Sequence, residues 1–203
     1  SAGCVIARRL SENRSVNVIL LEAGAASSEA NLRDPKQWPF LGRSNVDWSF
    51  ETVSQTHTNS RVHSWPRGKV LGGSSSINAM AHVRGHRRDF DHWAEKGCQG
   101  WSYAELLPYF IRSETSNYSD SSYHGNSGPL HLMQPTDPHP ITQCYLSAAE
   151  NMGYPGIDEH NGSTMTGPTL NTLTIVDNQR LSVSDAYLSP ILPRRNLKII
   201  ENC

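Results

Sequence analysis

The pattern of apolar and polar residues changes from a helical to a strand-like period within the first 25 positions. One side of a 3.6-residue helix collects the apolar side chains of Ala2, Val5, Ile6, Ala7 and Leu10. Residues 16–21, VNVILL, are largely apolar and β-branched, which is typical of a strand buried on both faces. We therefore expect an amphipathic helix, a short turn and a buried strand that ends at Glu22.

The same reasoning predicts further elements along the chain. Helices are expected over 90–96, 103–113, 141–152 and 184–192, and strands near 48–53 and over 128–132, 169–176 and 196–200. The helix over 103–113 has the clearest start, because Ser102 can cap it and Glu105 follows three residues later. Residues 25–64 are polar and proline-punctuated, and we expect a long surface excursion there. Mixed helices and strands of this kind indicate an α/β fold, α+β overall.

The first helix and strand also match the second half of a βαβ dinucleotide-binding unit. In that unit the third glycine of G-x-G-x-x-G lets helix and strand pack closely, and an acid roughly 20 residues further on binds the ribose hydroxyls. Gly3 and Glu22 have this spacing. Ser1 and Ala2 would then be the two variable residues, and we expect the first strand and first glycines to be missing. An ordinary amphipathic helix before an ordinary strand would also explain the pattern.

A second candidate segment runs from residue 65 to residue 88, WPRGKVLGGSSSINAMAHVRGHRR. Gly72 and Gly73 allow close backbone approach, and residues 74–76 offer hydroxyl and N–H groups that suit a pyrophosphate or a flavin edge. A flexible glycine-serine loop is the alternative. The serines lack the G-x-S-x-G elbow of a serine hydrolase.

Composition and charge exclude several functional classes. The formal net charge of -1 gives no electrostatic reason to expect a nucleic-acid partner, and no apolar run is long enough for a transmembrane segment. The four cysteines contain no C-x-x-C pair, so neither a zinc knuckle nor a disulfide framework is indicated, and a reducing, cytoplasmic location is expected.

The histidines do not form a metal-binding pattern. His82 and His86 could share a helix face, but arginines surround them and no H-E-x-x-H motif is present. We therefore expect no metal site. His124, which lies in loop-rich sequence with His131 and His139, is expected at the surface or in hydrogen bonds.

Seven motifs carry a resemblance that spans the whole chain. They are, in order, SAG, LLEAG, RGKVLGGSSSINAM, VRGHRRDFDHW, GWSYAELLPYF, YHGNSGPLHL and SDAYLSPILPRRNLKI. In this order they resemble the glucose–methanol–choline (GMC) oxidoreductases, which are flavin-dependent alcohol oxidases and dehydrogenases. The stretch INAMAHVRGH is similar to the choline dehydrogenase and pyridoxine oxidase side of that family.

The resemblance implies an organisation in two domains. Residues 1–113 would belong to a Rossmann-like FAD-binding domain of GMC type that lacks its first strand and first glycines. Residues 114–195 would form part of a sheet-containing substrate-binding domain, and residues 196–203 a strand that returns to the FAD-binding domain. The remainder of the same polypeptide would be needed to complete the fold.

The resemblance also implies a set of FAD-binding residues. These are Ser1, Ala2 and Gly3 at the pyrophosphate, Glu22 and Ala23 at the adenosine ribose, and Val70, Gly72, Gly73, Ser74, Asn78, Ala79 and Ala81 along the flavin. Some members attach FAD covalently through a histidine immediately before the asparagine. Ile77 occupies that place here, so FAD is expected to bind without a covalent link.

The implied reaction is hydride transfer from a primary or secondary alcohol to flavin N5, with electrons passed to O₂, a quinone or a dye. The histidine that serves as base in this family would lie beyond residue 203, so no catalytic residue is expected in this chain, which alone should be inactive. Two alternatives stay open, a hydroxynitrile lyase-like member that keeps FAD and a truncated, inactive flavin-binding fragment.

Overall fold

The computed structural model describes residues 1–25 and 30–203. The chain forms two compact units, one built from residues 1–80 and 175–203 and the other from residues 81–174. The first unit is therefore discontinuous in sequence. The domain boundaries expected after residues 113 and 195 refer to cofactor binding and substrate binding, whereas these two units are defined by contacts within the chain. The expected boundaries therefore stay a prediction.

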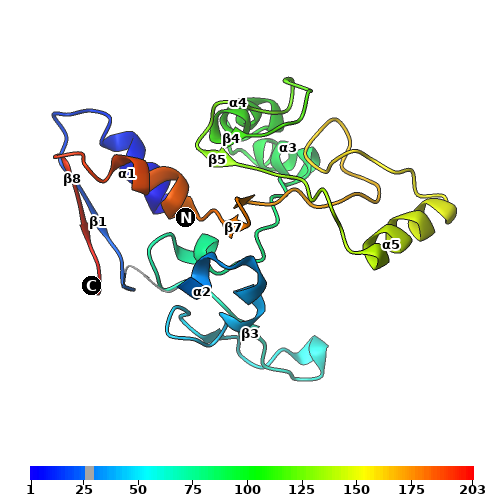
Figure 1. The fold of residues 1–203 in the computed structure, drawn as a ribbon, viewed down its shortest axis with the longest axis horizontal. Coiled ribbons are helices and arrows are strands. Elements are labelled where there is room, and N and C mark those ends of the chain that lie inside the picture. Colours follow the sequence, from blue (N-terminus) through cyan, green and yellow to red (C-terminus); the bar gives the residue numbers. More distant parts are fainter. Residues whose placement is uncertain (26–29) are drawn as a thin grey trace. The chain divides into compact units, whose positions relative to one another are not determined.

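A parallel strand pair with a helix beside it organises the first unit. The strand β1 (Val18–Leu21) pairs with β8 (Leu197–Ile200), so that the first and last parts of the chain lie side by side, blue and red in Figure 1. The helix α1 (Ala2–Leu10) packs on β1, and a Cβ on Gly3 would lie 3.4 Å from Cδ1 of Leu20. The predicted helix, turn and strand are confirmed.

Within residues 1–203 the first strand is not buried on both faces. Ile19 and Leu21 are 62% and 63% exposed, whereas Val18 and Leu20 are half-buried. The reason is that, within the described residues, β1 has β8 as its strand neighbour and α1 covers one face of the pair. The side chains of Ile19 and Leu21 point to the other face.

The segment before β8 is helical but irregular. A π-helical turn, η4 (Ser184–Leu188), is followed by a 3₁₀ turn, η5 (Ser189–Ile191), in place of the predicted α-helix. Pro190 explains part of the difference, because it has no N–H group to continue the α-helical hydrogen bonds. The buried side chains of η4 pack against α1.

The remainder of the first unit consists of short elements around a small core. They are α2 (Ala30–Arg33), η1 (Pro35–Phe40), β2 (Phe50–Glu51), η2 (Thr56–Thr58), β3 (Ser64–Trp65), η3 (Gly73–Ser76), β6 (Ile175–Val176) and β7 (Gln179–Arg180). The antiparallel pairs are β2 with β3 and β6 with β7. Residues 25–64 do form the long excursion expected, although residues 26–29 lie outside the described part. Its core side chains are Leu32, Leu41 and Val46, which cluster with Val70 and Ile77.

The second unit contains the helices α3 (Arg87–Glu95), α4 (Tyr103–Ser113) and α5 (Pro140–Asn151), and the parallel strands β4 (Glu114–Thr115) and β5 (Leu130–His131). Figure 1 shows α3 and α4 packed side by side. The predicted capping box of Ser102 and Glu105 is confirmed at α4. His86 caps α3 in the same way, which starts that helix before residue 90.

The strands expected over 128–132 and 169–176 are shorter than predicted. Leu130–His131 is all that pairs in the first, and the second keeps Ile175–Val176 and isolated bridges at Leu173. Among the described residues no helix is both long and apolar enough to cross a membrane.

Candidate functional site

The N-terminal end of α1 is accessible to a ligand. Ser1 precedes the helix, yet its Oγ donates to the carbonyl of Gly72 at 3.2 Å and accepts from the N–H of Ser75 at 3.2 Å, instead of capping α1. Ala2 and Gly3 are exposed, and the first turn carries no acidic residue. The N–H groups of this turn and the positive end of the helix dipole therefore suit an anion.

Two consecutive glycines carry the chain past this helix end. Gly72 and Gly73 have φ values of 95° and 59°, in the left-handed region that favours glycine. A Cβ on Gly72 would lie 2.4 Å from Oγ of Ser76, and a Cβ on Gly73 would lie 3.0 Å from the backbone nitrogen of Ser1. Conformation and space thus both require glycine here. Gly73 is also the first residue of the 3₁₀ turn η3.

The double-glycine segment is held by packing and hydrogen bonds. Val70 is 1% exposed and belongs to the core cluster, so it supports the segment from inside the unit and presents no side chain to a ligand. The Oγ of Ser74 accepts from the N–H of Gly68 at 3.2 Å, and the Oγ of Ser75 donates to the carbonyl of Gly72 at 2.7 Å. These contacts are not those of a flexible loop.

Glu22 lies at the carboxyl end of β1. Its Oε1 accepts from the N–H of Gly24 at 2.9 Å, which fixes the carboxylate at the strand end, and the side chain is half-exposed. Ala23, also half-exposed, stands between them. Gly24 in turn contacts the backbone of Lys69, because a Cβ there would lie 2.0 Å from the Lys69 carbonyl oxygen. The strand end is therefore joined to the segment that leads into the glycine turn.

Asn78 and Ala79 are exposed at the end of the same segment. The Oδ1 of Asn78 accepts from the N–H of Met80 at 3.0 Å and from Nη1 of Arg180 at 2.9 Å. Ala81 belongs to the second unit, where it pairs with Leu173 in an isolated bridge. The first unit thus brings together the start of α1, the turn at Gly72 and Gly73, and Glu22 at the end of β1. Asn78 is held in the same unit by Arg180, which lies 102 residues further along the chain.

Comparison with known proteins identifies the family. Residues 14–203 match the family model described as GMC oxidoreductase. The chain belongs to the GMC oxidoreductase family. It is 39% identical over 202 residues to an oxygen-dependent choline dehydrogenase from Brucella anthropi, covering 99% of this chain and 37% of that protein. It is 40% identical over 203 residues to a pyridoxine 4-oxidase from Microbacterium luteolum, covering 98% of this chain and 40% of that protein.

Solved GMC structures have the same fold. A pyridoxine 4-oxidase from Mesorbium loti superimposes with a TM-score of 0.96 at 36% identity, covering 100% of this chain and 40% of that one. An FAD-dependent oxidoreductase from Chaetomium thermophilum gives a TM-score of 0.88 at 28% identity, covering 97% and 36%. The chain therefore spans about two fifths of the length of these relatives.

The residues of the first unit fit the FAD of this GMC fold. A dinucleotide needs a helix N-terminus and close backbone approach for its pyrophosphate, and a carboxylate for its ribose hydroxyls. The accessible start of α1 and the turn at Gly72 and Gly73, whose Cβ positions are filled by neighbours, meet the first two requirements. Glu22 at the end of β1 meets the third.

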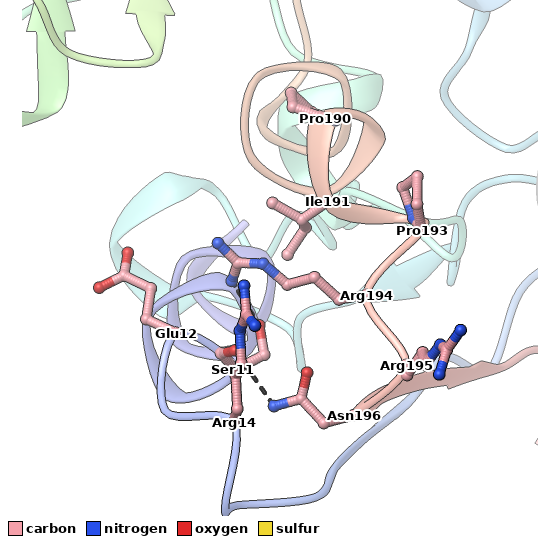
Figure 2. A pocket seen from close by; sticks show the side chains of 9 residues that line it. All are labelled: Ser11, Glu12, Arg14, Pro190, Ile191, Pro193, Arg194, Arg195 and Asn196. Atoms are coloured by element: carbon pink, nitrogen blue, oxygen red, sulfur yellow. Dashed lines mark hydrogen bonds between the residues drawn. The ribbon is translucent and has the colours of Figure 1, made fainter.

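A cavity of about 740 Å³ lies away from this candidate site, at the carboxyl end of α1 (Figure 2). Two of its polar side chains bind the end of the helix. Arg194 Nη1 donates to the carbonyl of Arg8 and to Oγ of Ser11, both at 2.7 Å. Asn196 Nδ2 donates to the carbonyl of Ser11 at 3.1 Å, drawn as a dashed line. These bonds satisfy carbonyl groups at the end of α1. Arg194 and Asn196 therefore cap the helix, and the cavity between them and α1 adds nothing to the candidate site.

A buried ionic cluster stabilises the second unit. Glu114 is fully buried, and it accepts from Arg84 Nη2 at 2.9 Å and pairs with His124 Nδ1 at 2.9 Å. The other ring nitrogen of His124 lies 3.0 Å from Glu159, and His82 Nε2 lies 3.4 Å from Glu114. His124 is therefore a hydrogen-bonding residue of the interior and not of the surface.

The cluster favours the charged forms of Glu114 and His124. Burial alone would raise the pKa of Glu114, but hydrogen bonds from His124 and His82 and the charge of Arg84 hold it well below its usual value. Burial would lower the pKa of His124, whereas its bonds to Glu114 and Glu159 raise it to about 9. Within the described ranges, no group of histidine, cysteine and acidic side chains has the geometry of a metal site.

The sequence analysis missed Arg180 as a site residue. A local signal was present, because Asp177 and Asn178 form a two-residue hairpin turn with φ values of 49° and 59°, which turns the chain inward at β7. What the guanidinium contacts depends on tertiary structure, and no local pattern indicates it.

Proposed function

We propose that this chain is the FAD-binding part of a flavin-dependent oxidoreductase that oxidises an alcohol. The observation that carries the proposal is the approach of Gly73 to Ser1 at the start of α1, where a Cβ would lie 3.0 Å from the Ser1 nitrogen. Such an approach, with an accessible helix start, is what a pyrophosphate requires. Membership of the GMC family supports the same assignment.

Each part of the first unit has a role in this proposal. The N–H groups at Ser1, Ala2 and Gly3 bind the pyrophosphate, and the carboxylate of Glu22 accepts hydrogen bonds from the adenosine ribose. Asn78 lies along the flavin and offers it a hydrogen bond. When bound, FAD would supply the redox chemistry, which is uptake of a hydride from the alcohol at N5 and transfer of electrons to O₂, a quinone or a dye.

The cofactor is held without a covalent bond in this proposal. Ile77 stands directly before Asn78, and its side chain is apolar and 7% exposed. An aliphatic side chain has no nucleophile to attach to a flavin. Ser74, which carries a hydroxyl, uses it to accept from Gly68.

The substrate class follows from the relatives, whose names specify choline and pyridoxine. Both compounds are small primary alcohols, so we propose a small alcohol as the hydride donor. The base that accepts the hydroxyl proton is expected outside residues 1–203, which makes the present chain a cofactor-binding part without catalytic residues of its own.

Anaerobic reduction of the flavin tests this proposal. The full-length protein, reconstituted with FAD, is mixed with choline or pyridoxine, and flavin absorbance near its visible maximum is followed. Bleaching by at least one small alcohol is expected, and glycine betaine, which lacks a hydroxyl group, serves as the negative control for choline. A protein that keeps its flavin oxidised with every alcohol but cleaves mandelonitrile would be a lyase instead, and one that binds no FAD would contradict the assignment altogether.

A further inference from the structure

Arg180 is a buried cation, and its hydrogen-bond acceptors among the described residues are all neutral. It is 4% exposed, and its Nε donates to the carbonyl of Leu32 at 2.9 Å. Its Nη1 donates to the carbonyl of Ser75 at 3.3 Å and to Oδ1 of Asn78 at 2.9 Å. Burial of a charge without an opposite charge is costly, so such an arrangement indicates a specific role for the guanidinium.

Among the described residues, one acidic side chain lines a small cavity together with Arg180, and that side chain has other partners. Asp185 lines this cavity of about 110 Å³ together with Arg180. One oxygen of Asp185 accepts from Arg33 at 3.0 Å, and the other accepts from the N–H and hydroxyl of Ser182 at 3.1 and 2.7 Å. Among the described residues, Nη2 of Arg180 has no hydrogen-bond partner.

The contacts of Asn78 fix the orientation of its side-chain amide. The atom that faces Arg180 Nη1 at 2.9 Å also faces the N–H of Met80 at 3.0 Å. Guanidinium and backbone N–H groups only donate hydrogen bonds, so that atom must be the carbonyl oxygen of Asn78. The amide nitrogen, Nδ2, is left as a pure donor on an exposed side chain.

We propose that Arg180 is the positioning residue of the flavin site: it holds Oδ1 of Asn78, so that Nδ2 is presented as a hydrogen-bond donor to an acceptor atom of the isoalloxazine. The inference rests on the proposed function, because it takes the flavin as the group that Asn78 faces. It adds which atom of Asn78 makes the contact and which residue enforces that choice.

The same residue supports the segment as a whole. By binding the carbonyl of Ser75 as well as Asn78, Arg180 joins the turn that carries the serines to the residues that follow it. Burial lowers the pKa of Arg180 to about 10, so the guanidinium stays protonated at neutral pH and all its donors persist.

Three substitutions separate positioning from simple packing. Arg180→Met removes the donors and the charge while keeping a long side chain. Asn78→Asp keeps an acceptor for Arg180 but has no amide donor. Arg194→Met is the matched control, because Arg194 also donates to a backbone carbonyl of the first unit, at the opposite end of α1. All are made in the full-length protein.

The readouts are the flavin visible spectrum, its reduction potential and the rate of anaerobic reduction. We expect Arg180→Met and Asn78→Asp each to slow reduction about tenfold, the effect of one hydrogen bond. Arg180→Met should also perturb the spectrum and make the potential more negative, and Arg180→Lys should restore part of the shift. The double variant should be no slower than Asn78→Asp alone, since Arg180 acts through Asn78.

Contrary results are equally defined. A wild-type spectrum, potential and rate in Arg180→Met, fully additive effects in the double variant, or the same perturbation in Arg194→Met would each overturn the inference. If the protein binds flavin but no alcohol reduces it, dye-coupled titration of the potential still tests Arg180 while the proposed function has failed. If it binds no flavin, both fail.

Discussion

The α-carbon of Gly24 lies against the carbonyl of Lys69, so close that a Cβ at Gly24 would be 2.0 Å from that oxygen. The contact joins the end of β1, where Glu22 is fixed, to the segment that enters the glycine turn. Gly68, which precedes Lys69, makes a similar contact, because a Cβ there would lie 2.3 Å from the carbonyl oxygen of Gly73. In both contacts the neighbouring atoms belong to the backbone, so no flexible side chain can move aside to make room for a Cβ.

Gly24→Ala should therefore destabilise the protein. The added methyl group forces the strand end and residue 69 apart, and we expect a loss of about 2–4 kcal/mol in the free energy of unfolding, typical of severe overpacking. Denaturant unfolding of the full-length protein measures it. Gly42→Ala is the control, because its Cβ would have its nearest neighbour at 3.7 Å, on a proline side chain. Equal effects of the two substitutions would contradict the assigned contact.

Reversing the charge at Glu22 should weaken FAD binding. Glu22→Arg replaces the acceptor for the ribose hydroxyls with a donor, and we expect the dissociation constant of FAD to rise at least about tenfold, the effect of 1.4 kcal/mol. Equilibrium dialysis or flavin fluorescence measures it. Glu12→Arg, which changes an exposed carboxylate in the ion pair with Arg9, is the matched control and should leave FAD binding unchanged. Unaltered affinity in Glu22→Arg would remove Glu22 from the site.

Removal of the buried imidazole should unfold the second unit more readily. His124→Gln leaves Glu114 and Glu159 without the cation between them, and breaking a buried pair of this kind costs about 3–5 kcal/mol. Urea unfolding, followed by circular dichroism, measures the loss. The exposed His131 provides the control substitution His131→Gln, for which a change below about 0.5 kcal/mol is expected.

The stabilisation from His124 should also depend on pH. Because the pKa of His124 is raised from 6.5 in the unfolded chain to about 9 in the folded protein, its contribution is complete below pH 6.5 and is lost as pH rises through 9. Glu114 has a lowered pKa, so its contribution is present above 4.5 and declines in acid. The stability difference between wild type and His124→Gln, measured from pH 5 to pH 10, should shrink above pH 6.5. A difference that grows with pH would refute a protonated His124.

The flavin should leave the protein on denaturation. With Ile77 in place of a linking histidine, precipitation in trichloroacetic acid should release all the visible absorbance into the supernatant. Flavin that stays with the precipitate, or that remains on the polypeptide in a denaturing gel, would show a covalent bond at another residue.

Local features of the fold were predictable because they depend on neighbouring residues. The apolar stripe of α1 and the cap formed by Ser102 and Glu105 are determined within one or two helical turns. The cap at His86 was missed, since histidine is an uncommon residue at that position. The burial of Ile19 is not a local property, because it depends on which layers cover the strand, and strand composition does not report it.

The residues of the candidate site likewise fall into those with a local sequence signal and those whose contacts depend on tertiary structure. The positions of Gly73 and Glu22 could be inferred from motifs, because glycine conformation and strand-end acids leave local signals. The burial of Val70, the contacts of Arg180 and the approach of Gly24 to Lys69 depend on segments that are far apart in sequence, from 24 residues between Val46 and Val70 to 148 residues between Leu32 and Arg180. No spacing rule describes such contacts, and a structure is needed to find them.

The pairing of β1 with β8 has a consequence for how the chain folds. Val18 pairs with Leu197, so the parallel ladder closes a loop of about 180 residues, and the entropy of that closure is lost before any strand contact repays it. During synthesis this ladder cannot close until the second unit, residues 81–174, and then β8 have been made. Until then the edge of β1 that faces β8 leaves its backbone N–H and C=O groups available to other chains, and we expect chaperone binding at residues 16–21 to improve the yield of native protein.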